Sequence, residues 1–202
     1  MAVRFLRDED GQPLGLHGIS RDITERRRLD VTIKTVLEST RQQYGEGFFV
    51  SVVKNIAEVL EVKYIYIGVV VDENTFRTLA VCKDGKIIEN FEYKLEGTPC
   101  EKVFNDENCF YRSKVQSLFP MDDLLVELEI ESYLGVRMSD SEGEIMGMMI
   151  CMDDKFMRDD PLAENLVGIV ASHVAAELQR RRSEDEKHSF NNSCSNLRDS
   201  TP

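Results

Sequence analysis

Two blocks of strand-like sequence, each flanked by helical sequence, constrain the fold of this chain more than any other feature. Residues 64–93 are rich in β-branched and aromatic side chains, and they contain an Asp84-Gly85 pair that fits a two-residue hairpin turn. Residues 133–152 form two further apolar runs around a polar turn at 139–143. Because strands joined by such short turns pair antiparallel, the pattern predicts an antiparallel sheet.

Amphipathic helices precede and follow these two blocks. Residues 48–60 carry apolar side chains at helical spacing, and residues 161–182 carry them at every fourth position. Small residues in the second stripe allow another helix to approach closely. Two shorter helices are expected, one opening with the capping-box pair Thr98 and Glu101 and one over residues 121–129.

The two ends of the chain have different patterns. Residues 3–20 read as two short apolar runs around a turn rich in Asp, Gly and Pro, which predicts a β-hairpin. Asp22 and Glu25 have capping-box spacing and open a helix expected to continue to about residue 43. From Ser183 onward the composition turns polar, so we expect a disordered tail.

Composition excludes several classes of protein. A length of 202 residues allows one domain and part of another. The net charge of −12 makes nucleic acid a poor partner, since affinity for it comes mostly from Lys and Arg. No apolar run approaches the roughly 18–20 residues that span a bilayer, and no secretory signal is visible. We therefore expect a cytoplasmic protein without a membrane segment in this chain.

The cysteines and histidines do not form a metal-binding pattern. The 5 cysteines lack CxxC spacing, which in a reducing compartment indicates free thiols. The 3 histidines lie far apart in the sequence, so we expect no metal site. Carboxylate pairs such as Asp122-Asp123 lie at helix starts, where acidic side chains stabilise the helix dipole. We therefore assign no catalytic residue.

The element order and several segments resemble the GAF domain family. The segments that carry the resemblance are 91–100, 109–111, 118–120, 131–136 and 143–155. The resemblance implies an α+β fold with a six-stranded antiparallel sheet. The N- and C-terminal helices would pack on one face, and short helices and loops would cover the other face and enclose a small-molecule pocket.

Residues 11–26 resemble the last hairpin and exit of a PAS domain. The two resemblances divide the chain into a PAS-like remnant at 1–21, a signalling or linker helix at 22–44, a GAF-like sensory domain at 45–182 and a polar tail at 183–202. They also imply a piece of a longer sensor protein, of the kind that often ends in a histidine kinase or a cyclic-dinucleotide enzyme. That output machinery is absent here, so we do not expect an enzyme.

The resemblance also suggests which residues line the pocket. The candidates are Tyr93, Cys100, Phe110, Tyr111 and Tyr133. Cys100 is the second helical residue after Thr98, where free N–H groups and the helix dipole would lower the pKa of a thiol. Two interpretations stay open: a reactive or anion-binding thiol, and a small buried side chain.

The expected function is regulatory small-molecule sensing, transmitted through helices of a homodimer. One alternative is a thiol enzyme similar to free methionine sulfoxide reductase, using Cys82, Cys100 and Cys109. Another is a pure dimerisation or spacer module, its pocket filled by side chains such as Met148 and Phe110. The ligand is unknown. A covalent bilin is not expected, because no Cys precedes a His and no Asp-Ile-Pro occurs.

Overall fold

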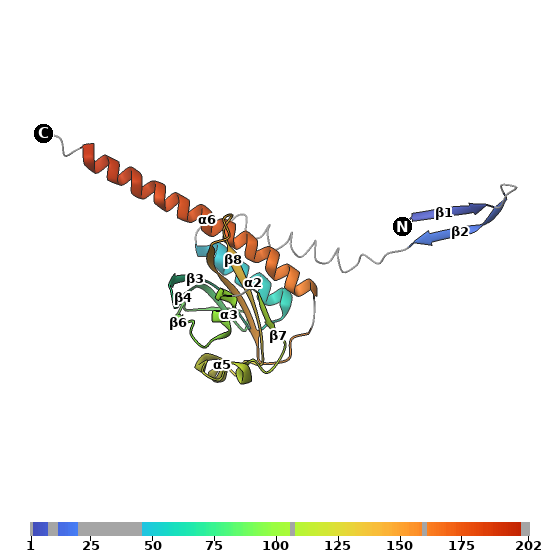
Figure 1. Cartoon of the computed structure of the whole chain (residues 1–202), viewed down its shortest axis with the longest axis horizontal. Coiled ribbons are helices and arrows are strands. Elements are labelled where there is room, and N and C mark those ends of the chain that lie inside the picture. Colours follow the sequence, from blue (N-terminus) through green and yellow to red (C-terminus); the bar gives the residue numbers. More distant parts are fainter. Residues whose placement is uncertain (1, 8–11, 20–45, 106–107, 159–160, 199–202) are drawn as a thin grey trace.

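An antiparallel sheet forms the centre of the computed structural model, which describes residues 2–7, 12–19, 46–105, 108–158 and 161–198 (Figure 1). Its strands are β3 (Tyr64–Asp72), β4 (Thr75–Lys83), β5 (Lys86–Ile88), β6 (Glu92–Lys94), β7 (Cys109–Tyr111), β8 (Ser132–Ser139) and β9 (Ile145–Asp153). They pair in the order β5-β4-β3-β9-β8-β7, and β6 pairs with β4 beside β5. The antiparallel sheet of about six strands that the sequence predicts is therefore confirmed.

The strand-like sequence after the Asp84-Gly85 turn predicts one strand over residues 87–93, but the structure has two short strands there, β5 and β6. Both lie along the same edge of β4, at its two ends. Between them the Phe91 N–H donates to the Thr78 hydroxyl at 2.8 Å, and the Asn90 amide donates to the Leu79 carbonyl at 3.2 Å. Side chains thus replace part of the regular ladder, which is why the single predicted strand is wrong.

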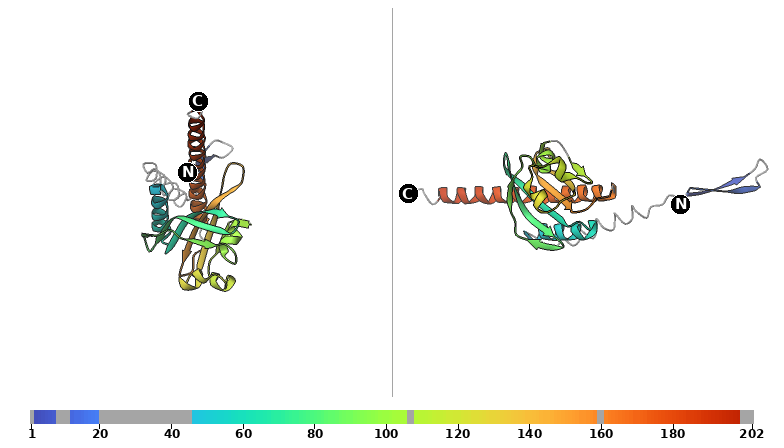
Figure 2. Two further views of the ribbon diagram at one scale, coloured as in Figure 1. Left: turned by 90° about the vertical axis from the view of Figure 1, so that its left-hand side faces the viewer. Right: turned by 90° about the horizontal axis from the view of Figure 1, so that it is seen from below.

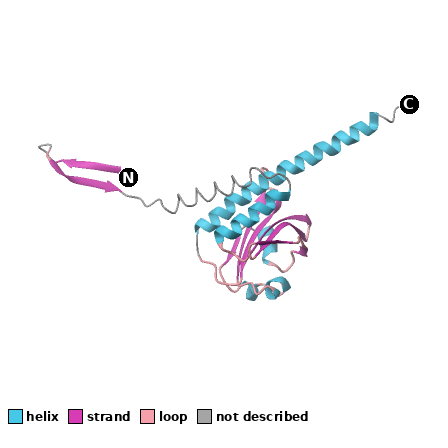
Figure 3. Ribbon diagram, turned by 180° about the vertical axis from the view of Figure 1, so that it is seen from behind, coloured by secondary structure: helices cyan, strands magenta, loops and turns pink. Residues whose placement is uncertain are grey.

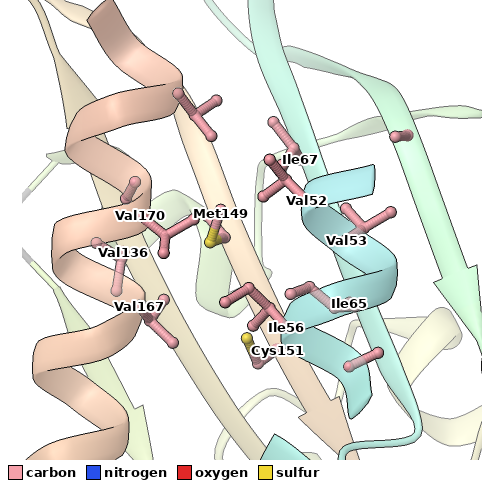
Figure 4. Close-up of a cluster of buried hydrophobic side chains, with 14 of the residues drawn as sticks. Val52, Val53, Ile56, Ile65, Ile67, Val136, Met149, Cys151, Val167 and Val170 are labelled. Carbon is pink, nitrogen blue, oxygen red and sulfur yellow. The ribbon is translucent and has the colours of Figure 1, made fainter. Parts of the chain in front are cut away.

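Two helices, α2 (Glu46–Leu60) and α6 (Pro161–Arg198), cover one face of the sheet (Figures 2 and 3). We call this pair the helix layer. Figure 4 shows its contact with the sheet, where aliphatic side chains from both helices meet those of the strands. The labelled residues are Val52, Val53, Ile56, Ile65, Ile67, Val136, Met149, Cys151, Val167 and Val170, all buried. Glu61, at φ 53°, ends α2 by turning the chain out of the helix.

Three short helices cover the other face: α3 (Pro99–Asn105), α4 (Val115–Leu118) and α5 (Asp123–Glu127). The Asp122 carboxylate accepts hydrogen bonds from the N–H groups of Leu124 and Leu125 at 3.1 and 3.3 Å. The capping role predicted for this aspartate is thereby confirmed. The predicted division, with terminal helices on one face and short helices on the other, is also confirmed.

The disordered tail expected from Ser183 is wrong as far as Arg198, because α6 continues to that residue. The stretch 183–198 is polar, but no Gly or Pro interrupts it, so nothing in its backbone stops the helix. Arg180 strengthens the continuation by pairing with Glu177 on one turn and Glu184 on the next. The prediction was wrong because it took polar composition as a sign of disorder. A helix that extends past its domain packs on nothing there, so it needs no apolar stripe.

The N-terminal hairpin is confirmed as a separate two-stranded sheet of β1 (Ala2–Arg7) and β2 (Pro13–Ile19). The strands pair antiparallel, with Ala2 opposite Ile19. Its assignment to a PAS domain stays a prediction, and the linker helix expected at 22–44 lies outside the described residues. Among the helices that are described, none combines the length and the apolar character needed to cross a bilayer.

Candidate functional site

A cysteine and three tyrosines meet in the buried space between the sheet and α3. The Tyr93 hydroxyl donates a hydrogen bond to the Cys100 sulfur at 2.9 Å, and the Tyr133 hydroxyl lies 3.1 Å from the same atom. The Tyr66 hydroxyl lies 3.7 Å from the sulfur and 3.3 Å from the Tyr93 hydroxyl. These four residues, named the Cys100 cluster below, connect β3, β6 and β8 to α3.

Strand alternation places the tyrosines on this face. In β3, Ile65 and Ile67 pack against the helix layer, whereas Tyr66 points to the α3 side. In β8, Tyr133 points to the α3 side and its neighbour Leu134 to the helix layer. These two strands therefore carry two different surfaces, an aliphatic one toward the helix layer and one with tyrosine hydroxyls toward α3.

A glycine makes room for the Tyr133 ring. A β-carbon at Gly135 would lie 2.7 Å from both the Tyr133 hydroxyl and its Cε1 atom, and 2.5 Å from Cγ2 of Val103 in α3. The ring therefore lies over the glycine, two residues along the strand, and reaches Cys100. Any side chain at this position would push Tyr133 or α3 away.

The start of α3 fixes the cysteine. Gly97 turns the chain at φ 76°, and its N–H donates to the Glu101 carboxylate at 2.9 Å. The Thr98 hydroxyl accepts from the Glu101 N–H at 3.3 Å, as the capping-box spacing predicts. The first turn so formed directs Cys100 at the sheet, where 2% of the residue is exposed.

The Cys100 cluster is electrically neutral near physiological pH. Burial is the largest influence on Cys100 and raises the pKa of its thiol. Burial likewise holds the pKa of Tyr66, Tyr93 and Tyr133 well above the ordinary value for tyrosine. The expectation that the helix start lowers the pKa of Cys100 is therefore wrong, because removal of water from the thiol has the larger effect and acts in the opposite direction. This favours the interpretation of Cys100 as a small buried side chain.

The three hydroxyl hydrogens and the thiol hydrogen of the cluster can all be given acceptors within the cluster. Tyr93 and Tyr133 donate to the sulfur, the thiol donates to Tyr66, and Tyr66 donates to Tyr93, in an arrangement that the four distances allow. Leaving one such buried group unpaired costs about 1–3 kcal/mol. A molecule that enters this space must therefore bring its own hydrogen-bonding groups, and charged groups on the ligand would find no ionised partner in the cluster.

The structure brings four of the five predicted pocket residues together. Besides Tyr93, Cys100 and Tyr133, the ring of Tyr111 packs on this face, with its centroid 6.2 Å from that of Tyr133. Phe110 does not join them, because it packs against the helix layer on the opposite face. The correction follows from alternation along β7, where adjacent residues point to opposite faces.

Sequence reasoning missed Tyr66. The signal that could have found it is the alternation of Tyr64 and Tyr66 with Ile65 and Ile67, which separates a face with hydroxyl groups from an aliphatic face. The sheet separates Cys82, on the helix-layer side, from Cys100 and Cys109, which both pack on the α3 side. In the part of the chain that the structure describes, no three His, Cys, Asp or Glu side chains are grouped to hold a metal ion.

Comparison with solved structures identifies the fold. The GAF domain from an Acinetobacter phosphoenolpyruvate-protein phosphotransferase superposes with a TM-score of 0.64 over 83% of this chain and 99% of that chain, at 10% identity. The chain has the GAF fold. The A. aeolicus nlh2 GAF domain in an inactive state gives a TM-score of 0.63 over 78% of this chain and 99% of that chain, at 14% identity. The chromophore-binding domain of Stigmatella aurantiaca phytochrome P1 gives 0.61 over 82% of this chain and 63% of that one, at 11% identity.

Sequence comparison adds one distant relative. A hybrid signal transduction histidine kinase F from Dictyostelium discoideum is 21% identical over 139 residues, which is 69% of this chain and 12% of the relative. The chain thus spans about an eighth of that protein's length. No family model matches the chain.

Proposed function

We propose that this GAF domain is a regulatory sensory module of a longer signal-transduction protein, such as a sensor histidine kinase or a cyclic-dinucleotide enzyme. A small molecule binds on the α3 face, and the resulting change passes through helices that pair with those of a second copy. The similarity to a hybrid signal transduction histidine kinase supports a place within a larger protein, since the match covers 12% of it.

The observation that carries the proposal is the two-sided packing of three central strands. β3, β8 and β9 each place one row of side chains on the α3 face and the alternate row against the helix layer. Met148 and Ile150 of β9 face α3, while Met149 and Cys151 face the helix layer. Close packing transmits displacements, so a change at the α3 face shifts the strands that support α2 and α6.

The extension of α6 supplies a path out of the domain. Its first half packs on the sheet through residues such as Val170 and Val174, and Arg181 lies over the Phe49 ring of α2 at 4.3 Å. Its second half extends past the sheet, away from the rest of the domain (Figures 1 and 3). A continuous helix carries a shift of its packed half to its far end without an intervening hinge.

A second function, a dimerisation or spacer module without a ligand, is favoured by one observation. The Cys100 cluster satisfies its own hydrogen bonds, and Met148 beside it is fully buried. We propose no catalytic role. What supports this is the raised pKa of the Cys100 thiol, together with the position of Cys82 across the sheet from Cys100 and Cys109.

Native mass spectrometry of the full chain purified from cells tests ligand binding. We expect a small-molecule mass that disappears on denaturation, and lower occupancy in Tyr66→Phe, which removes one hydroxyl from the cluster. Tyr64→Phe is the matched control, because Tyr64 lies on the same strand and face but makes no hydrogen bond in the cluster. A bare mass in every preparation would support the spacer function instead.

Cysteine crosslinking tests the dimer. In a Cys109→Ser, Cys194→Ser background, we expect Ile169→Cys or Ala176→Cys to form disulfide dimers, since both positions lie on the exposed side of α6. Met121→Cys is the control, at a residue 81% exposed beside α5. A monomer by light scattering, together with crosslinks no faster than those of the control, would contradict transmission through paired α6 helices.

A further inference from the structure

A cleft of about 560 Å³ opens between the C-terminal end of α2 and the start of α6. The apolar residues that line it include Val62, Leu134 and Met157. Leu134 also packs in the core under the helix layer, so the cleft lies on the opposite side of the sheet from the Cys100 cluster. Small-molecule sites have volumes of about 300–1,000 Å³ and mostly apolar linings with a few polar groups, and the cleft has this character.

A buried carboxyl group, Asp153, lines this cleft. Strand alternation places Met149, Cys151 and Asp153 of β9 toward the helix layer, and Asp153 is 4% exposed. Its cationic contact, the ammonium of Lys155, is 3.9 Å away on a side chain that is 70% exposed. Asp153 has therefore lost most of its water but is only loosely paired with a positive charge.

Two of the apolar side chains that line the cleft are exposed to solvent. Phe156, after β9, is 58% exposed, and Val59, near the end of α2, is 43% exposed. Both line the cleft. Apolar groups that flank a recess containing one buried polar group are suited to hold a molecule with an apolar body and one polar end.

We infer that this cleft binds a small organic cation, with its ammonium group at Asp153 and its apolar body between Val59 and Phe156. An anion is the poorer fit, because the cations of the cleft, Lys155 and Arg158, lie in water and gain little from pairing there. The buried Asp153 carboxylate gains more free energy from pairing with a cation, since the cost of removing its water was already incurred when the chain folded. The inference goes beyond the proposed function and does not depend on it.

The protonation of Asp153 gives the site a pH dependence. Burial raises the pKa of Asp153, and a hydrogen bond with the Asp154 carboxylate raises it further. The Asp154 carboxylate itself stays ionised, because the Lys63 ammonium lies 2.6 Å from its Oδ2 atom and lowers its pKa. The other charged groups facing the cleft are Glu61 of α2 and, from the segment after β9, Lys155 and Arg158. A cation binds the ionised form of Asp153, so affinity increases as pH rises through the raised pKa and decreases below it.

Three probes with the same apolar body test the charge preference. We titrate the full chain with 2-phenylethylammonium, 2-phenylethanol and 3-phenylpropionate and follow backbone amide shifts by NMR. The ammonium compound is expected to bind with a Kd of about 1 mM, as suits so small a molecule, and to shift amides at 59–62 and 153–158. The carboxylate should bind at least about tenfold more weakly.

Substitutions connect the binding to the named residues. Asp153→Asn keeps the shape and should weaken binding of 2-phenylethylammonium by about tenfold or more. Phe156→Ala, at an exposed position, should weaken it several-fold without unfolding the chain. Asp123→Asn is the matched control on the opposite face and should leave the Kd unchanged. If Asp153→Asn does not fold, Phe156→Ala and the pH dependence of the Kd carry the test.

Any of four results overturns the inference. These are no saturable shifts up to about 20 mM probe, shifts confined to another part of the domain, binding of 3-phenylpropionate as tight as that of the ammonium compound, or a Kd unaffected by both cleft variants. Shifts confined to the α3 face would support a ligand site there, and the other results do not bear on that face, which lies across the sheet. Failure of this inference is therefore distinguishable from failure of the sensory proposal.

Discussion

Replacing Gly135 with alanine tests whether α3 rests directly on β8. The new methyl group would lie 2.5 Å from Cγ2 of Val103 and 2.7 Å from the Tyr133 hydroxyl. Val103 is fully buried and Tyr133 is 1% exposed, so neither can swing into solvent. Overpacking of this kind costs about 1–3 kcal/mol, from which the lower backbone entropy of alanine subtracts about 0.5–1 kcal/mol.

The two effects leave a net cost of about 0–2.5 kcal/mol, and because both contacted groups are buried and cannot move aside we expect Gly135→Ala to lower the free energy of unfolding by about 1–2 kcal/mol, measured by urea denaturation. For a chain of this length that corresponds to a fall in melting temperature of about 2–8 °C. Gly168→Ala is the matched control, because a β-carbon there meets no atom within 4 Å. In a helix that substitution should stabilise the chain, by about 0.5–1 kcal/mol.

A double-mutant cycle identifies the atom responsible. Val103→Ala alone should cost about 2 kcal/mol for two lost methyl groups. Combined with Gly135→Ala it should cost less than the sum by at least about 0.5 kcal/mol, because the new methyl occupies the vacated space. Strict additivity, or a Gly135→Ala variant as stable as the original chain, would refute direct contact of α3 with the strand through this glycine.

Three further predictions concern thiols, caps and ion pairs. Iodoacetamide at pH 8 should leave Cys100 and Cys151 unmodified in the folded chain, because burial raises the pKa of both, to about 12 for Cys151; peptide mapping that finds rapid labelling would contradict this. Asp122→Ala should cost about 1 kcal/mol in urea denaturation through loss of the α5 cap. Glu177→Gln should cost up to about 1 kcal/mol at pH 7, because hydrogen bonds from Arg180 lower the pKa of Glu177. A lowered carboxyl pKa stabilises above the ordinary value and loses that effect as pH falls through the folded value, so melting temperatures of the variant and the original chain should converge in acid.

The parts of the fold that sequence predicts are those with local causes. The Asp84-Gly85 turn, the apolar spacing of residues 48–60 and the cap at Asp122 each depend on a few adjacent residues, and each matches the structure. The antiparallel order follows from the hairpins. Local pattern therefore predicted the strands, their antiparallel pairing and the helices, whereas the division of the helices between the two faces came from the resemblance to GAF domains.

The parts that sequence missed depend on register and burial. Phe110 and Tyr111 are adjacent, and only the pairing of Tyr111 with Tyr133 decides which of them faces α3. The pKa of the Cys100 thiol depends on how much water reaches it, which is set by three strands distant in sequence. Tyr66 gained its role in the same way, from a contact with residues 27 and 34 positions further along the chain.

Because α6 is long, a small tilt of the helix at the sheet would move its far end by a larger distance. Its contacts with the sheet end near Leu178, and the helix continues to Arg198, which adds about 30 Å at 1.5 Å per residue. A tilt of only about 5° at the sheet would move the far end sideways by about 2.6 Å over that length. A displacement too small to disturb the core of the domain would thus be enlarged at the C-terminal end of α6. There it would be comparable to the shifts of about 1–2 Å by which helices switch subunit interfaces.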